Sequence, residues 1–271
     1  MAQSKPMMKK RKKERDPKRI IAPLVVLVIL YVGLEIFLRV FQVPAYVLPT
    51  PTNIIIGTVS SFSIILPDLL FTLKIICIGF CIAIPAGILL AALFSQFNIL
   101  VKAMQPVVIW LVITPMITLI PLMTLWLGTD PNLRVIIVII QATPIICLNT
   151  LNGFTRVEQE KLELARSVGA TKLQTFVSII FMNALPQVFT GIKLGCIFST
   201  IGAVSADFVS RGMGLGDRII KFTKYSNFEE SYGCIILIAI IGITLYTIVV
   251  CSGRSKGGEP LCRHLRSNLT M

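Results

Sequence analysis

The chain has few of the side chains that carry acid–base or metal chemistry. Its 271 residues include one histidine, His264, and 13 aspartates and glutamates. A membrane-embedded enzyme would need clustered His, Asp or Glu ligands, and the sequence has no such cluster. It also lacks the G-x-x-x-x-G-K-[ST] loop that cradles nucleotide phosphates. We therefore expect no metal site, no catalytic site and no ATP hydrolysis by this chain.

The cysteines do not form a recognisable framework. Their number, seven, is odd, most lie inside apolar runs, and none forms a C-x-x-C pair. This pattern excludes a disulfide scaffold and a typical zinc site. Cys77 and Cys81 share a helix face, where they are expected to serve as small apolar packing residues.

Apolar residues dominate, at 55% of the sequence with a mean hydropathy of +0.82. Such a composition predicts an all-α membrane protein. We predict a tail over residues 1–19, a membrane domain over 20–251 and a second tail over 252–271. The six predicted membrane helices cover about 20–41, 67–93, 101–127, 133–151, 187–209 and 233–251.

The net charge of +13 indicates membrane topology rather than nucleic-acid binding. The basic run from Lys9 to Arg19 is expected to anchor the N-terminus in the cytosol, and six crossings return the C-terminus to the same side. The loop from Val43 to Pro67 has no Lys or Arg, as expected outside. The segment 211–224 carries four cations although it should lie outside, so we expect its glycines to let it fold back against the protein.

One polar segment, residues 152–186, interrupts the apolar sequence. Helix-forming residues run from Val157 to Val168 and end before Gly169, the usual residue after a helix C-terminus. Thr171 and Gln174 have capping-box spacing for a second helix, which carries an apolar face. The segment is therefore predicted to be two helices joined by a tight turn, a rigid knob suited to docking a soluble partner.

Small residues recur every fourth position in two predicted helices: Gly79, Ala83, Gly87 and Ala91, and Gly191, Gly195, Ser199 and Ala203. These stripes allow close approach of helices, either within one subunit or at a contact beside a pathway. Prolines such as Pro115 are expected to kink helices around a path. Candidate pathway or gate residues are Thr114, Met116, Gly195, Ser199 and Asp207; Asp207 has the alternative of pairing with a nearby Arg.

The segment 152–186 resembles the EAA loop of permease subunits of binding-protein-dependent ABC importers. Glu163-Leu164-Ala165, Gly169 and Ile179 stand in the register E-A-A, three residues, G, nine residues, I-x-L-P. Leu164 replaces the first Ala, and Phe181-Met182 replaces Leu-Pro. The following Ala184-Leu185-Pro186 resembles the branch for nitrate, sulfonates, taurine and thiamine-precursor pyrimidines, as do the segment 44–51 and Gly214-Leu215-Gly216.

This resemblance implies a type I ABC importer permease fold in a bacterial cytoplasmic membrane. It implies a second permease subunit, in a homodimer, and an external solute-binding protein. It also implies a cytosolic ATPase that binds ATP and Mg²⁺ and docks on the segment 152–186, hereafter the coupling loop. The resemblance assigns this docking to Glu163, Ala165, Gly169 and Ile179.

Three other classes of protein fit the sequence less well than an importer subunit. An ion-coupled secondary transporter would need intramembrane carboxylates and often inverted repeats, and neither is clear. A membrane-embedded enzyme lacks its ligands here. In a membrane-tethered DNA-binding protein the coupling loop would be a helix-turn-helix. The second helix of the loop is too apolar to present to bases.

The charge distribution predicts which side of the membrane each loop occupies. In a cysteine-free background, we expect an impermeant thiol reagent added to intact cells to label Thr52→Cys and to spare Glu160→Cys. Permeabilised cells, in which both sites react, provide the control. Labelling of Glu160→Cys but not Thr52→Cys in intact cells would reverse the topology.

Overall fold

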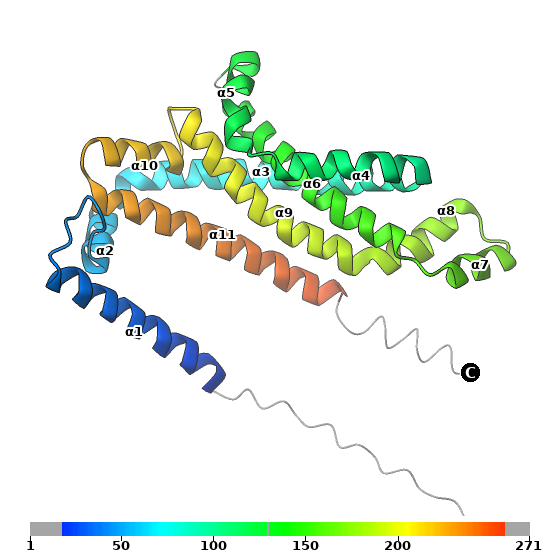
Figure 1. Ribbon diagram of the computed structural model, residues 1–271, viewed down its shortest axis with the longest axis horizontal. Helices are drawn as coiled ribbons and strands as arrows, with labels where there is room; N and C mark the ends of the chain where they lie inside the picture. Colours follow the sequence, from blue (N-terminus) through cyan, green and yellow to red (C-terminus); the bar gives the residue numbers. More distant parts are fainter. Residues whose placement is uncertain (1–17, 129, 258–271) are drawn as a thin grey trace, which may run out of the picture.

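The computed structural model describes residues 18–128 and 130–257, and these residues form helices joined by short turns (Figure 1). The tails predicted over 1–19 and 252–271 lie largely outside this range. The elements are α1 (Lys18–Val40), α2 (Pro51–Ser60), α3 (Phe62–Ser95), α4 (Asn98–Ile113), α5 (Met116–Leu127), α6 (Pro131–Thr155), α7 (Gln159–Ser167), α8 (Lys172–Thr175), the π-helical η1 (Phe176–Phe181), α9 (Met182–Val209), α10 (Leu215–Lys224) and α11 (Phe228–Gly257).

Within the described residues, four helical stretches are long and apolar enough to cross a membrane. They are Phe62–Ser95, Pro131–Thr155, Lys172–Val209 and Phe228–Gly253, and the bent pair α4–α5 would make a fifth. The first predicted span, 20–41, is helical as α1. The all-helical fold is confirmed, and the count of six spans stays a prediction.

The prediction of one continuous helix over 101–127 is wrong. The chain turns by 92° between α4 and α5, and Thr114 and Pro115 adopt extended conformations there. A proline disfavours helical geometry in the residue before it and has no N–H to continue the ladder. Figure 1 shows α5 standing out from the bundle as a result.

The predicted start of the fifth membrane helix near Pro186 is also wrong. Pro186 lies inside α9, and α8, η1 and α9 form one helical stretch of 38 residues from Lys172 to Val209. At 1.5 Å per residue this stretch is about 57 Å long. The second helix of the coupling loop is therefore the beginning of a membrane span and not a separate surface helix.

Helix α6 lies against both α3 and α9, and the small-residue stripes form these contacts. A Cβ atom added to Gly79 of α3 would lie 2.5 Å from Val138, and one added to Gly87 would lie 2.8 Å from Ile146. A Cβ atom on Gly195 of α9 would lie 2.6 Å from Ile146. Both stripes thus pack within one subunit, and α6 is the helix that they share.

The segment 211–224 folds back against the protein, as predicted. Gly212 and Gly214 have φ values of +134° and +109°, which L side chains rarely adopt, and they turn the chain after α9. Leu215, Ile219 and Phe222 then bury one face of α10 against α3 and α11.

The contact between Gly195 and Ile146 predicts the effect of a larger side chain. Gly195→Leu should destabilise the protein by roughly 1–3 kcal/mol, because overpacking forces the helices apart. Thermal unfolding in detergent measures this loss. Gly33→Leu is the matched control, since a Cβ atom at Gly33 meets nothing within 4 Å. Equal unfolding temperatures for the two variants would contradict close packing at Gly195.

Candidate functional site

The turn of the coupling loop has a complete Schellman motif. The amide of Gly169 donates to the carbonyl of Arg166 at 3.0 Å, and that of Ala170 donates to Ala165 at 3.0 Å. Gly169 has φ +74°, so it adopts the left-handed conformation that its position predicted. This geometry satisfies the last carbonyls of α7 and fixes the direction in which the chain leaves it.

The second helix of the loop begins with a full capping box. The Thr171 hydroxyl accepts from the amide of Gln174 at 3.3 Å, and the Gln174 side chain accepts from the amide of Thr171 at 2.9 Å. Both predicted bonds are therefore present. Together with the glycine turn, they make the loop a defined shape rather than a flexible connection.

The four predicted docking residues have different exposures. Glu163 and Gly169 are exposed, Ala165 is buried at 3% exposure, and Ile179 is half-buried in η1. The structure brings Ala165 and Gly169 together in the turn and places Glu163 on the outer face of α7. Ala165 therefore supports the loop from inside.

Sequence reasoning missed the exposed apolar side chains of this loop. Leu164, Val168 and Leu173 are 64%, 74% and 73% exposed around the turn. The sequence signal for this surface was Leu164, which replaces the first Ala of the E-A-A pattern. Large exposed apolar side chains on a charged loop make this surface a candidate contact site.

Aromatic packing joins the loop to the bundle. The ring of Phe154, at the end of α6, lies 5.3 Å from that of Phe176 and 6.2 Å from that of Phe181. Phe154 belongs to a buried cluster with Ala184 and Val188 of α9. The loop is therefore attached to α6 as well as to its own helix.

The candidate pathway residues Thr114 and Met116 lie on the two sides of the helix break. The Thr114 hydroxyl donates to the carbonyl of Trp110 at 2.8 Å, and Met116 packs in a buried cluster with Ile120 and Leu133. Helix α4 has 16 residues, about 24 Å, which is less than a hydrocarbon core of about 30 Å. A span that begins at the start of α4 would therefore break within the hydrocarbon core, where irregular backbone must face protein or water and not lipid.

Two other candidates, Gly195 and Ser199, are buried in the contact with α6. The Ser199 hydroxyl donates to the carbonyl of Gly195 at 2.8 Å, so it satisfies its hydrogen bond within α9. Their neighbours Leu194 and Phe198 pack on the cluster that contains Ile146 of α6, as does Val112 near the end of α4.

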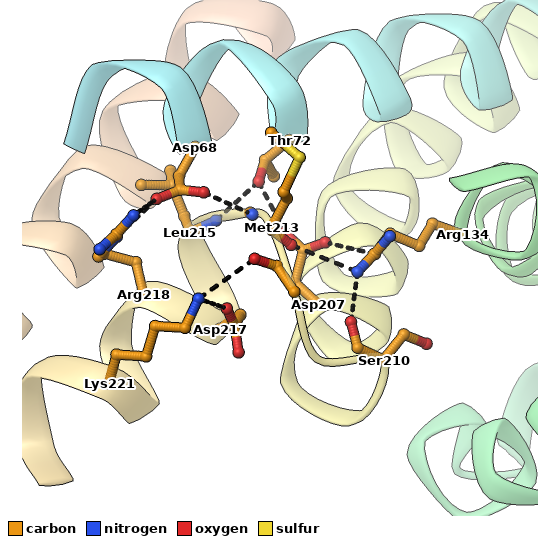
Figure 2. Close-up of polar contacts among 12 residues, drawn as sticks. Asp68, Thr72, Arg134, Asp207, Ser210, Met213, Leu215, Asp217, Arg218 and Lys221 are labelled. Carbon is orange, nitrogen blue, oxygen red and sulfur yellow. Dashed lines mark hydrogen bonds and ion pairs between the residues drawn. The ribbon is translucent and has the colours of Figure 1, made fainter. Parts of the chain in front are cut away.

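Asp207, the last candidate, is completely buried and pairs with an arginine (Figure 2). Its Oδ1 lies 3.2 Å from Nε of Arg134 as an ion pair, and its Oδ2 accepts from the Thr72 hydroxyl at 2.6 Å. Arg134 also donates to the carbonyls of Ser210 and Met213. The pairing predicted as one alternative for Asp207 is present, with its partner on α6.

The same network caps the N-terminus of α10, where Gly214 has no side chain to do so. Asp68 of α3 accepts from the amide of Gly214 at 2.9 Å, and Thr72 accepts from that of Leu215 at 2.9 Å. A Cβ atom on Gly216 would lie 2.8 Å from Asp207. The Gly-Leu-Gly sequence is therefore needed for the backbone to reach these side chains.

Ion pairs account for two of the cations in the segment 211–224. Arg218 lies 2.5 Å from Asp68, and Lys221 lies 2.5 Å from Asp217. Sequence reasoning did not single out Arg134 or Asp68, although a charge in an apolar helix is a signal for a partner. Among the residues that the structure describes, no three His, Cys, Asp or Glu side chains form a metal site.

The buried pair predicts a non-additive effect of mutation. Arg134→Met leaves Asp207 buried without its countercharge and should cost about 3–5 kcal/mol. The double variant Arg134→Met/Asp207→Asn should be more stable than the sum of the two single losses predicts. Thermal unfolding of Arg134→Met, Asp207→Asn and the double variant in detergent measures the coupling between the two residues. Arg39→Met, which removes an exposed pair with Glu35, is the control and should cost far less. Additive losses would show that the pair is not coupled.

Comparisons with known proteins agree with this architecture. The chain is 28% identical to a formylaminopyrimidine transport permease, ThiX, from Halalkalibacterium halodurans, over 82% of this chain and 88% of that protein. It is 26% identical to a putative aliphatic sulfonates transport permease, SsuC, from Bacillus subtilis, over 74% and 73%. A nitrate import permease, NrtB, from Synechocystis is 27% identical, over 63% and 62%.

Solved structures share the fold. A crystal structure of an amino acid ABC transporter with histidines superposes with a TM-score of 0.59 at 17% identity, covering 74% of this chain and 97% of that one. The inward-facing MetNI methionine ABC transporter gives a TM-score of 0.50 at 20% identity, covering 69% and 93%.

The family model described as "binding-protein-dependent transport system inner membrane component" matches residues 83–254, more than half of the chain. This match covers the coupling loop, Arg134 and Asp207. It favours an importer permease over the ion-coupled secondary transporter weighed from the sequence. The chain belongs to the family of inner-membrane permease components of binding-protein-dependent ABC transport systems.

Proposed function

We propose that this chain docks a cytosolic ATPase through its coupling loop and forms a solute pathway with a second, identical copy. The observation that supports docking is the exposed apolar surface of Leu164, Val168 and Leu173 on a rigid turn. Glu163 lies beside this surface and adds a charge-assisted contact. ATP and Mg²⁺ are bound by the ATPase and not by this chain.

The geometry supports a mechanical route from the loop to the far side of the membrane. The coupling loop continues without a break into α9, which ends at Val209, and Asp207 in its last turn joins the polar network with α10. Figure 1 places α7 and α8 at one end of the bundle and α10 at the other. Closure of two ATPase subunits on ATP would draw the loops together and move each α9 as a rigid body.

A second copy of the chain would cover the face of α5. Leu122, Leu125 and Trp126 are 48%, 79% and 74% exposed there. In this arrangement the break at Thr114–Pro115 lies within the membrane, and a water-filled path between the two copies would hydrate its irregular backbone. We therefore assign Thr114 and Met116 to the pathway, with Gly195, Ser199 and Asp207 supporting the helices around it.

The relatives support a small solute, delivered by an external binding protein. A pyrimidine vitamin precursor and a nitrate-like or sulfonate-like anion are the two substrate classes that their names offer. We place the chain in a bacterial cytoplasmic membrane with both termini and the coupling loop in the cytosol, as the charge distribution indicates.

Co-purification of the cognate ATPase with the permease tests the docking. Glu163→Lys and Leu164→Glu should each reduce capture of the ATPase at least tenfold. The first reverses the charge of a contact residue, and the second places a charge in the apolar surface. Gly169→Val should do the same, because a β-branched residue resists positive φ.

Tyr225→Glu is the control for this experiment. Tyr225 is 76% exposed and follows α10, far from the coupling loop, so its substitution should leave capture unchanged. All variants are first checked for a monodisperse elution profile. Full capture of the ATPase by the three loop variants would refute docking at this surface.

A further inference from the structure

A hollow of about 370 Å³ lies beneath the coupling loop, and its lining combines basic and aromatic side chains. Ser95 and Gln96 come from the end of α3, and Phe154 comes from the end of α6. Arg166 of α7 and Lys172 of α8 line it from the loop. The hollow therefore lies where the membrane helices meet the loop, at the level expected for lipid headgroups.

The hollow has positive charge without a matching negative charge. Its described lining includes Arg166 and Lys172 and no carboxylate. Neither cation lies within ion-pair distance of a carboxylate among the described residues, whereas the neighbouring Lys161 pairs with Glu158 at 3.1 Å. Two cations that share a hollow repel each other, and an anion between them removes this repulsion.

Hydrogen-bond donors are available for such an anion. The Arg166 guanidinium and the Lys172 ammonium supply several N–H groups. Gln96 uses its amide nitrogen for one bond, to the carbonyl of Ala92 at 3.3 Å, and keeps a second N–H. An oxyanion with several acceptor oxygens, such as a phosphate ester, fits this set better than a single carboxylate does.

The side of the hollow toward the bundle is apolar. Phe154 and Phe176, whose rings lie 5.3 Å apart, and Ile180 line the side toward the bundle. Their cluster is continuous with the buried residues of α6 and α9. The ligand therefore has an anionic group at the cations and an apolar part at the aromatic rings.

We propose that this hollow binds a phosphate ester with an apolar group, either the headgroup of an anionic phospholipid or a soluble organic phosphate. Basic pockets at the cytosolic ends of membrane helices bind such headgroups. The bound anion would tie α7 to α8 across the turn. Its effect on coupling rests on the proposed function, but binding itself requires neither the ATPase nor a substrate.

Binding to the purified full-length chain in neutral detergent tests the proposal. Native mass spectrometry compares dihexanoyl phosphatidylglycerol, dihexanoyl phosphatidylcholine and phenyl phosphate, a soluble phosphate ester with an apolar ring, as probes. We expect phosphatidylglycerol to bind at least tenfold more tightly than phosphatidylcholine. Arg166→Gln/Lys172→Gln should lose at least tenfold of this affinity.

Arg211→Gln/Lys224→Gln is the matched control, because it removes the same charge from exposed positions beside α10. It should keep the affinity of the unmodified chain. Binding of phenyl phosphate as tight as that of phosphatidylglycerol would support the site and indicate a soluble ligand.

Equal affinity for the two lipids, or full retention of binding by Arg166→Gln/Lys172→Gln, would overturn the proposal. Each single variant, Arg166→Gln and Lys172→Gln, is measured too, so that the result stands if the double variant fails to fold. Because no ATPase is present, failure here would leave the docking experiment unaffected.

Discussion

Close packing of α3 and α9 on α6 is the constraint on which the rest of the structure depends. In a bilayer, lipid tails are as apolar as the side chains, so helices associate through van der Waals contact and hydrogen bonds. Gly79, Gly87 and Gly195 leave no room for a Cβ atom against Val138 and Ile146. These contacts set the distance of α3 and α9 from α6. Helices α4, α5, α10 and α11 pack directly on this group of three helices.

The two ends of α6 hold the two ends of the long helix that leaves the coupling loop. Phe154 packs on η1 at one end, and Arg134 pairs with Asp207 at the other. Asp68 and Thr72 of α3 then fix α10 through its backbone amides. In the proposed mechanism, a displacement of the coupling loop would be carried to α10 through these packed helices and buried ion pairs.

Local features of the fold could be predicted from the sequence, and features that depend on distant partners could not. Gly169 and the Thr171–Gln174 box determine their own backbone, so their geometry followed from the residues. The presence of a proline alone did not predict whether a helix breaks or continues. Pro186 lies within α9, whereas Pro115 lies at the break between α4 and α5. The partner of Asp207 is 73 positions earlier, and only the packing of α9 on α6 brings them together.

The most direct test of this account is whether the loop and the far end of α9 move together. Spin labels at Val168→Cys, on the coupling loop, and in separate chains at Met213→Cys, beyond α9, give distances between the two copies in the complete transporter. The account predicts that adding ATP and Mg²⁺ changes both distances. A change at Val168 with no change at Met213 would show that motion stops within the membrane and would contradict rigid coupling through α9.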